Sequence, residues 1–139
     1  MPVSFRILKS HGLTYVRYEG VATLDETLAA FAEFAQHPDC RPGLKQLVDL
    51  TAVQEVKFDF PKLMEMQAKK ADVFMAGPAE TLIVYLTNAS KTSNMAHMIL
   101  RSWEPFPSVV PRVIEDEAAA LSILGLREDS IEALLATAA

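Results

Sequence analysis

The feature that most constrains the fold is an alternation of short β-type segments and amphipathic helical segments along the chain. Apolar and polar side chains alternate in residues 3–7, and a run rich in β-branched and aromatic residues follows at 13–18. The break at His11-Gly12 between these runs predicts an opening hairpin. After the hairpin, apolar runs alternate with helical segments, which predicts a mainly parallel sheet flanked by helices with right-handed crossovers.

Two helices are predicted in the first half of the chain from their end signals. Thr23 and Glu26 have the spacing of a capping box, and the helix that they begin is expected to end near Gln36. A second helix is expected to begin at Asp59, an acidic cap before a proline in the first turn, and to stop at Gly77. The first helix repeats apolar side chains at helical spacing, and its predicted buried stripe consists of Leu24, Leu28, Phe31 and Ala35.

Three further apolar runs are predicted strands. Residues 47–50 form a short buried strand that is expected to end at Thr51. Residues 81–86 form the most continuous apolar run and are assigned to the centre of the sheet. Residues 109–114 form the last strand, and Pro111, which cannot donate a hydrogen bond to a neighbouring strand, predicts an edge position for it.

The second half of the chain also predicts three helices. One follows the polar segment 88–94, one is capped by Gly125, and a short terminal one begins around Ser130. The buried face of the first of these is expected to include Met95, Met98, Ile99 and Ser102. The order ββαβαβαβα(α) predicts one α/β domain over residues 1–139, with a mixed, mainly parallel sheet of about five strands flanked by about four or five helices.

Composition fits one globular domain and argues against nucleic-acid binding. A chain of 139 residues is long enough to bury one hydrophobic core. Its net charge is −5 and its lysines and arginines are scattered, whereas nucleic-acid binding needs a basic stripe that neutralises phosphates. The single cysteine, Cys40, excludes an internal disulfide and a cysteine-based zinc site. No apolar run approaches the ~20 residues of a membrane helix, and residues 1–6 lack a signal-peptide core, so we expect a cytoplasmic protein without an integral membrane segment.

Four strings in order along the chain carry a family resemblance. They are residues 13–20, the strand end at 48–51, the turn at 95–98 and residues 111–121. Together they are similar to STAS domains (sulfate transporter and anti-sigma-factor antagonist), specifically to the SpoIIAA-like branch of small bacterial proteins. The resemblance covers nearly the whole chain, and it implies the α/β order given above.

The phosphorylation motif of the resembled family is missing from this sequence. In its anti-sigma-factor antagonists, a strand ending in an Asp-Leu-Ser-like sequence is followed by Asp-Ser-Ser-Gly, whose serine a partner kinase phosphorylates. Matching residues 49–51 to that strand end without gaps places the motif on residues 57–60, Lys-Phe-Asp-Phe, which hold no hydroxyl. We therefore expect no phosphorylation site of this kind.

The sequence shows no pattern typical of a catalytic, metal or cofactor site. It has no His-x-x-x-His or Glu-x-x-His spacing for a metal, no glycine-rich phosphate loop and no Gly-x-Ser-x-Gly. We expect no metal, no cofactor and no enzyme activity. The alternative is an enzyme, which would require four parts of the chain to lie together in the fold: Asp49, Thr51, His97 and residues 88–94.

A polar cluster between the predicted strand 81–86 and the next helix is the first candidate ligand site. Open α/β sheets bind ligands at the carboxyl ends of their strands, where helix amide groups and a lysine can hold an anion. The alternative is that these residues only cap and solvate the helix. The candidate residues are Asn88, Ser90, Lys91, Thr92, Ser93 and, at intervals of about one turn further on, His97 and Arg101.

Methionines gathered on two predicted helices are the second candidate. Methionine forms adaptable apolar grooves for a lipid-like ligand or a partner helix, although it also fills cores. The candidate groove consists of Met64, Met66, Met95 and Met98.

Two functions follow from these features. The first is a non-catalytic binding or regulatory module that acts through protein–protein contacts or self-association as a homodimer. It predicts an almost pocketless structure with an exposed apolar patch between the second and third helices. The second is a carrier of a small apolar or amphiphilic anionic ligand. It predicts a deep apolar cavity lined by the methionines, with Lys91, Arg101 or His97 at its mouth.

Overall fold

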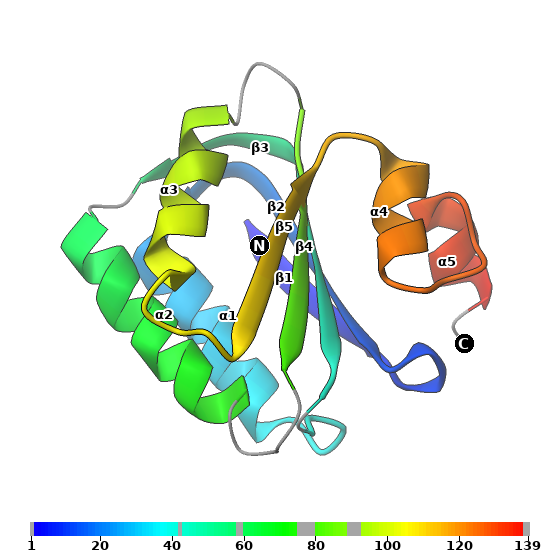
Figure 1. The fold of residues 1–139 in the computed structure, drawn as a ribbon, viewed down its shortest axis with the longest axis horizontal. Helices are drawn as coiled ribbons and strands as arrows, with labels where there is room; N and C mark the ends of the chain where they lie inside the picture. The colour runs from blue at the N-terminus through cyan, green and yellow to red at the C-terminus, as the bar shows by residue number, and fades with distance from the viewer. Residues whose placement is uncertain (1, 42, 58–59, 75–79, 89–92, 138–139) are drawn as a thin grey trace.

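The computed structural model describes residues 2–41, 43–57, 60–74, 80–88 and 93–137 (Figure 1). The strands are β1 (Val3–Leu8), β2 (Leu13–Thr23), β3 (Lys45–Lys57), β4 (Thr81–Leu86) and β5 (Val109–Ile114). The α-helices are α1 (Leu24–Gln36), α2 (Phe60–Phe74), α3 (Ser93–Trp103), α4 (Glu117–Ile123) and α5 (Ile131–Thr137). A short 3-10 helix, η1 (Lys9–His11), connects β1 to β2.

The strands form one mixed sheet in the order β1-β2-β3-β4-β5. β1 pairs antiparallel with β2, and the other neighbouring strands pair in parallel. The predicted opening hairpin is confirmed, and Gly12 supplies its left-handed backbone (φ 61°) at the end of η1, a conformation that glycine adopts without steric cost. The predicted α/β class, with a mainly parallel sheet of five strands flanked by helices, is confirmed as well.

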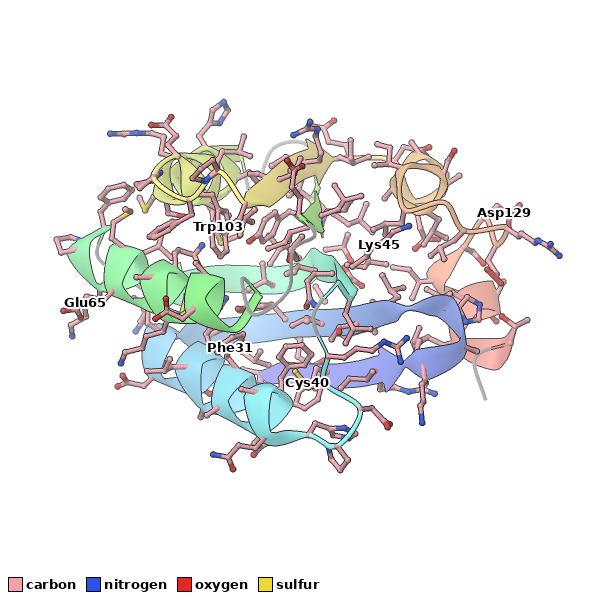
Figure 2. All side chains as sticks on the ribbon, turned by 60° about the horizontal axis from the view of Figure 1, so that its bottom comes forward. Phe31, Cys40, Lys45, Glu65, Trp103 and Asp129 are labelled. Carbon is pink, nitrogen blue, oxygen red and sulfur yellow. The ribbon has the colours of Figure 1, made fainter. Side chains whose placement is uncertain are left out.

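Helices cover both faces of the sheet (Figure 1). α1, α2 and α3 lie on one face, and α4 and α5 lie on the other. Side chains alternate between the faces along a strand, so Val48 packs in the core beneath α1–α3 and Leu47 packs in the core beneath α4 and α5. Lys45 ties β3 to the second layer, because its Nζ donates a hydrogen bond of 2.9 Å to the carbonyl of Leu124 at the end of α4 (Figure 2).

The buried face of α1 differs from the predicted stripe. Leu28 and Phe31 are only partly buried, and Ala35 is exposed. The residues of α1 that are buried are Leu24, Thr27 and Phe34. The helix packs against β1, β2 and α2. Its buried side chains are therefore those that face these three elements, and they do not form a single stripe. Thr27 is compatible with burial because its hydroxyl donates a hydrogen bond of 3.0 Å to the carbonyl of Thr23.

The predicted strand 47–50 is the inner part of a much longer strand. β3 does not end at Thr51 but continues to Lys57, and this extension pairs with the second half of β2, with register shifts near Gly20. The extension mixes the buried Val53 with the exposed Gln54, Glu55 and Lys57, and β4 does not pair with it, so it has no continuous apolar run that would mark it as a strand. The assignment of residues 81–86 to the centre of the sheet is wrong: β3 is the middle strand, and β4 lies between β3 and β5.

The remaining boundaries follow the predicted signals closely. β5 is an edge strand that contains Pro111, as predicted. Gly125 follows α4 with a positive φ of 76°, and Ser130 caps the start of α5. The predicted helix start at Asp59 and the predicted stop at Gly77 lie outside the described residues.

The third helix buries a face close to the expected one. In α3, Ile99 and Ser102 are buried, and Met95 and Met98 are partly buried. Trp103, at the end of α3, is buried as well, and its burial was not predicted from the sequence. Within the ranges that the structure describes, no helix is both long enough and apolar enough to span a membrane.

Candidate functional site

A cavity that is partly open to solvent lies between the sheet and the helices α1, α2 and α3. It consists of two adjoining hollows, of about 60 Å³ and about 30 Å³. Both hollows are lined by the same five residues, which come from two helices and three strands: Tyr18, Thr27, Val48, Lys70 and Tyr85. We call these two hollows together the central cavity. Figure 2 shows the side chains that fill this layer, among them Phe31 on α1 and Trp103 on α3.

Apolar side chains form most of the cavity wall. The larger hollow is bounded by Phe31 and Phe34 of α1 and by Val3 and Phe5 of β1. The smaller hollow lies further toward α3 and is bounded by apolar residues of α1, β3, α2 and α3: Leu24, Leu50, Leu63, Met66, Met95 and Ile99. The polar residues in the wall are Tyr18, Thr27, Gln46, Gln67, Lys70 and Tyr85.

Lys70 is the cationic group of the central cavity. It is partly buried on α2, and its Nζ lies 5.8 Å from the centroid of the Phe31 ring, a cation–π contact. Burial lowers the pKa of its ammonium group from 10.5 to about 8. None of the ion pairs in the described part of the chain includes Lys70. The ammonium group thus lines an apolar cavity without a carboxylate to balance its charge.

Two tyrosine hydroxyls belong to the same cavity. Tyr18 and Tyr85 are both buried, and the charge of an ionised Tyr18 contributes to raising the pKa of Tyr85. Burial raises the pKa of Tyr18 to about 12 and also raises that of Tyr85. Tyr85 accepts a hydrogen bond of 2.9 Å from Trp103 Nε1. At neutral pH both phenols keep their protons and can act as hydrogen-bond donors.

Gln67 supplies a buried acceptor one helical turn before Lys70. Its side chain is 1% exposed, and its Nε2 donates a hydrogen bond of 2.9 Å to Ser102 Oγ on α3. Ser102 in turn donates its hydroxyl proton to the carbonyl of Ile99. The Oε1 of Gln67 has no hydrogen-bond partner among the described residues. A buried acceptor without a donor costs about 1–3 kcal/mol, which a ligand or a water molecule can recover.

The candidate methionines divide between cavity and surrounding core. Met66 and Met95 line the smaller hollow. Met98 packs with Met66 in the cluster around Leu24, and Met64 is partly buried on α2. Neither Met64 nor Met98 is among the residues that line the hollow. Two of the four candidate methionines therefore line the smaller hollow, and the predicted groove stays a prediction.

The polar segment predicted as a ligand site does not reach the central cavity with its described residues. Asn88 is exposed, and its Nδ2 donates a hydrogen bond of 2.7 Å to the carbonyl of Thr51. His97 and Arg101 are exposed on α3, and the guanidinium of Arg101 lies 5.4 Å from the centroid of the Phe60 ring. Ser93 begins α3. The other three candidates, Ser90, Lys91 and Thr92, lie outside the described residues.

The structure links Asn88, Thr51 and Asp49 of the enzymatic alternative through hydrogen bonds, but it places His97 over the opposite face of the sheet from Asp49. Asp49 is buried, and its carboxylate accepts hydrogen bonds from the Tyr15 hydroxyl (2.7 Å) and the Thr51 hydroxyl (2.6 Å). Tyr15 packs on the face that carries α4 and α5, whereas His97 lies on α3 over the opposite face. Across the described ranges, no group of three or more His, Cys, Asp and Glu is placed to hold a metal ion.

Lys70 and Gln67 are the site residues that sequence reasoning missed. From the sequence, Lys70 was treated as one of the scattered lysines and arginines of the chain. A helical signal was present nevertheless: Leu63, Gln67, Lys70 and Ala71 fall at i, i+4, i+7 and i+8, so the lysine lies on the apolar face of α2. A lysine on the apolar face of an amphipathic helix is the sequence signal that could have identified this residue.

Comparison of the chain with protein-family models, with curated proteins and with solved structures finds no significant match.

Proposed function

We propose that this protein binds a small amphiphilic ligand in the central cavity, with the anionic group of the ligand at Lys70, and that it acts as a non-catalytic carrier or sensor of that ligand. The observation that carries the proposal is an ammonium group that faces an apolar cavity and has no ion-pair partner in the described part of the chain. A partly buried charge of this kind is costly until an opposite charge balances it. A ligand carboxylate supplies that charge, and an alkyl or aryl body fits the apolar wall.

The volume of the cavity limits the ligand. The two hollows, of about 60 Å³ and about 30 Å³, have room for only a few water molecules. Any larger ligand must therefore displace part of the wall, and α1 and α2 are the elements that would move apart, since the larger hollow lies between α1, Lys70 of α2 and the sheet. Met66 and Met95 can adjust their side chains to a ligand more easily than branched residues can. A medium-chain carboxylate such as octanoate therefore requires this opening of the wall, and it is the ligand class that we propose.

Titration calorimetry with octanoate, octan-1-ol and octylammonium at pH 7 tests this proposal. We expect octanoate to bind, and the neutral and cationic analogues to bind at least about tenfold more weakly, because a charge-assisted hydrogen bond is worth roughly 1.5–3 kcal/mol. Lys70→Met should remove this preference for the anion. Lys69→Met, which changes the exposed neighbour, is the matched control and should keep it. Equal binding of octylammonium and octanoate would refute the proposal.

We also propose that the chain is a STAS-type domain of the SpoIIAA-like kind, a proposal supported by the antiparallel opening hairpin followed by alternating strands and helices. Contacts with a partner protein, assembly as a homodimer and a cytoplasmic location remain predictions from the sequence. Light scattering after size-exclusion chromatography tests the homodimer, because a mass near that of one 15.3 kDa chain would contradict it.

A further inference from the structure

The amide of Gln67 is held in one orientation by its neighbours on α3. Ser102 gives its only hydroxyl proton to the carbonyl of Ile99, so the Ser102 oxygen can only accept from Gln67. The amide nitrogen of Gln67 must therefore face Ser102, and the amide oxygen must face away from it. This chain of two hydrogen bonds fixes an acceptor, with no partner in the described part of the chain, in the wall of the central cavity.

Gln67 and Lys70 lie side by side along the cavity. They are three residues apart on α2, a spacing that puts side chains on the same helix face with Cβ atoms about 5–6 Å apart. Both line the smaller hollow. At this spacing a ligand whose anionic group is at Lys70 can place its next one or two carbon atoms toward the free oxygen of Gln67.

We propose that the central cavity selects ligands that carry a hydroxyl group next to their anionic group, namely medium-chain 2- or 3-hydroxycarboxylates. The ligand hydroxyl donates to Gln67 Oε1 while the carboxylate is bound by Lys70. This inference rests on the proposed function, because it places the anionic group at Lys70, and it adds the polar group that would distinguish one carboxylate from another. A ligand without the hydroxyl leaves the buried oxygen unpaired, which is the usual way in which a binding site rejects a deoxy analogue.

A set of ligands with the same chain length separates these two proposals. The probes are octanoate, 2-hydroxyoctanoate, 3-hydroxyoctanoate and 8-hydroxyoctanoate, each titrated into the wild-type protein by calorimetry at pH 7. We expect 2- or 3-hydroxyoctanoate to bind about tenfold more tightly than octanoate, as a recovered hydrogen bond to a buried acceptor implies. The isomer with its hydroxyl at the far end of the chain should bind more weakly than octanoate, since it puts a polar group against the apolar wall.

The variant Gln67→Met removes the acceptor while keeping a side chain of similar length and volume. The preference for the hydroxylated ligand over octanoate should fall to within about twofold in this variant, in part because octanoate no longer leaves a buried oxygen unpaired. Ser102→Ala, which frees the amide without removing it, should reduce the preference less than Gln67→Met does. If a variant fails to fold, the ligand series measured with the wild-type protein still tests the selectivity proposal.

Each outcome decides the proposal. If octanoate binds and the 2- and 3-hydroxy isomers bind no better, the acceptor is satisfied by a water molecule and the selectivity proposal is wrong, while the proposed carrier function stands. If the preference survives in Gln67→Met, another group reads the hydroxyl and the assignment to Gln67 is wrong. If no carboxylate binds the wild-type protein, both proposals are overturned.

Discussion

Replacing Lys70 by methionine should stabilise the ligand-free protein at neutral pH. Methionine keeps an unbranched apolar side chain in the cavity wall and removes an ammonium group that has no ion-pair partner in the described part of the chain. Burial lowers the pKa of Lys70 from 10.5 to about 8, so the folded state disfavours the charged form that the unfolded chain tolerates. Lys70→Met therefore removes an unfavourable charge from the folded protein.

The size of the effect follows from the pKa difference between the folded and unfolded states. A fall from 10.5 to about 8, at about 1.4 kcal/mol for each pKa unit, corresponds to roughly 3 kcal/mol. The ammonium group keeps some contact with water and gains from the Phe31 ring at 5.8 Å, so we expect a net stabilisation of about 1–2 kcal/mol. This is a large change for a domain whose whole stability is about 5–15 kcal/mol.

The same pKa difference sets the pH range of the effect. Between about pH 8 and pH 10.5 the unfolded chain still holds the proton of Lys70 and the folded chain has lost it. The stability of the wild-type protein should therefore rise with pH across this range, relative to a protein without this lysine. The advantage of Lys70→Met should be complete below pH 8 and should disappear as the pH approaches 10.5.

Urea denaturation followed by circular dichroism at pH 6.5, 7.5, 9 and 10 measures this difference. Lys69→Met is the control, because the adjacent lysine is exposed and its removal should change the unfolding free energy by less than about 0.5 kcal/mol at every pH. Two results would contradict an unfavourable charge at Lys70. One is a lower unfolding free energy for Lys70→Met than for the wild type at pH 7, and the other is a difference in unfolding free energy that does not depend on pH.

Four further predictions concern the binding site and the fold. The affinity for octanoate should fall as the pH rises through about 8, because Lys70 loses its charge there; titration calorimetry at pH 7 and pH 9.5 measures this, and a constant affinity would contradict it. Trp103→Phe leaves the buried hydroxyl of Tyr85 without its 2.9 Å donor and should cost about 1–3 kcal/mol of unfolding free energy in urea. Thr23→Ala removes the capping box of α1 and should cost about 1 kcal/mol, with Asp25→Ala in the same first turn costing less. Leu121→Ala opens a cavity beneath α4 and should lower the unfolding free energy by about 2–5 kcal/mol, and a loss below 1 kcal/mol would show that α4 is not part of the cooperative core.

The candidate site shows where prediction from sequence stops. The methionine pattern identified two residues of the cavity wall, Met66 and Met95, because apolar residues at helical spacing point inward. The polar residues of the same wall were not found, since Lys70 and Gln67 are charged or polar and such residues usually face solvent. Their burial depends on α1 and α3 packing against α2, and no pattern within α2 alone contains that information.

The sequence by itself determined the local features of this protein. The left-handed turn at Gly12, the capping box at Thr23 and the edge position of Pro111 each depend on the backbone freedom or hydrogen-bonding groups of a few adjacent residues. The alternation of strands and helices then determined the fold class, because a parallel sheet is the ordinary way to bury such segments.

The tertiary structure decided the rest. The length of β3 depends on its partner β2, a pairing between residues about 30 positions apart that no local pattern specifies. The buried face of α1 depends on three neighbouring elements. The central cavity, and with it the functional proposal, exists only where α1, α2 and α3 meet the sheet and place Lys70 among apolar side chains, because burial and the pKa that follows from it are properties of packing.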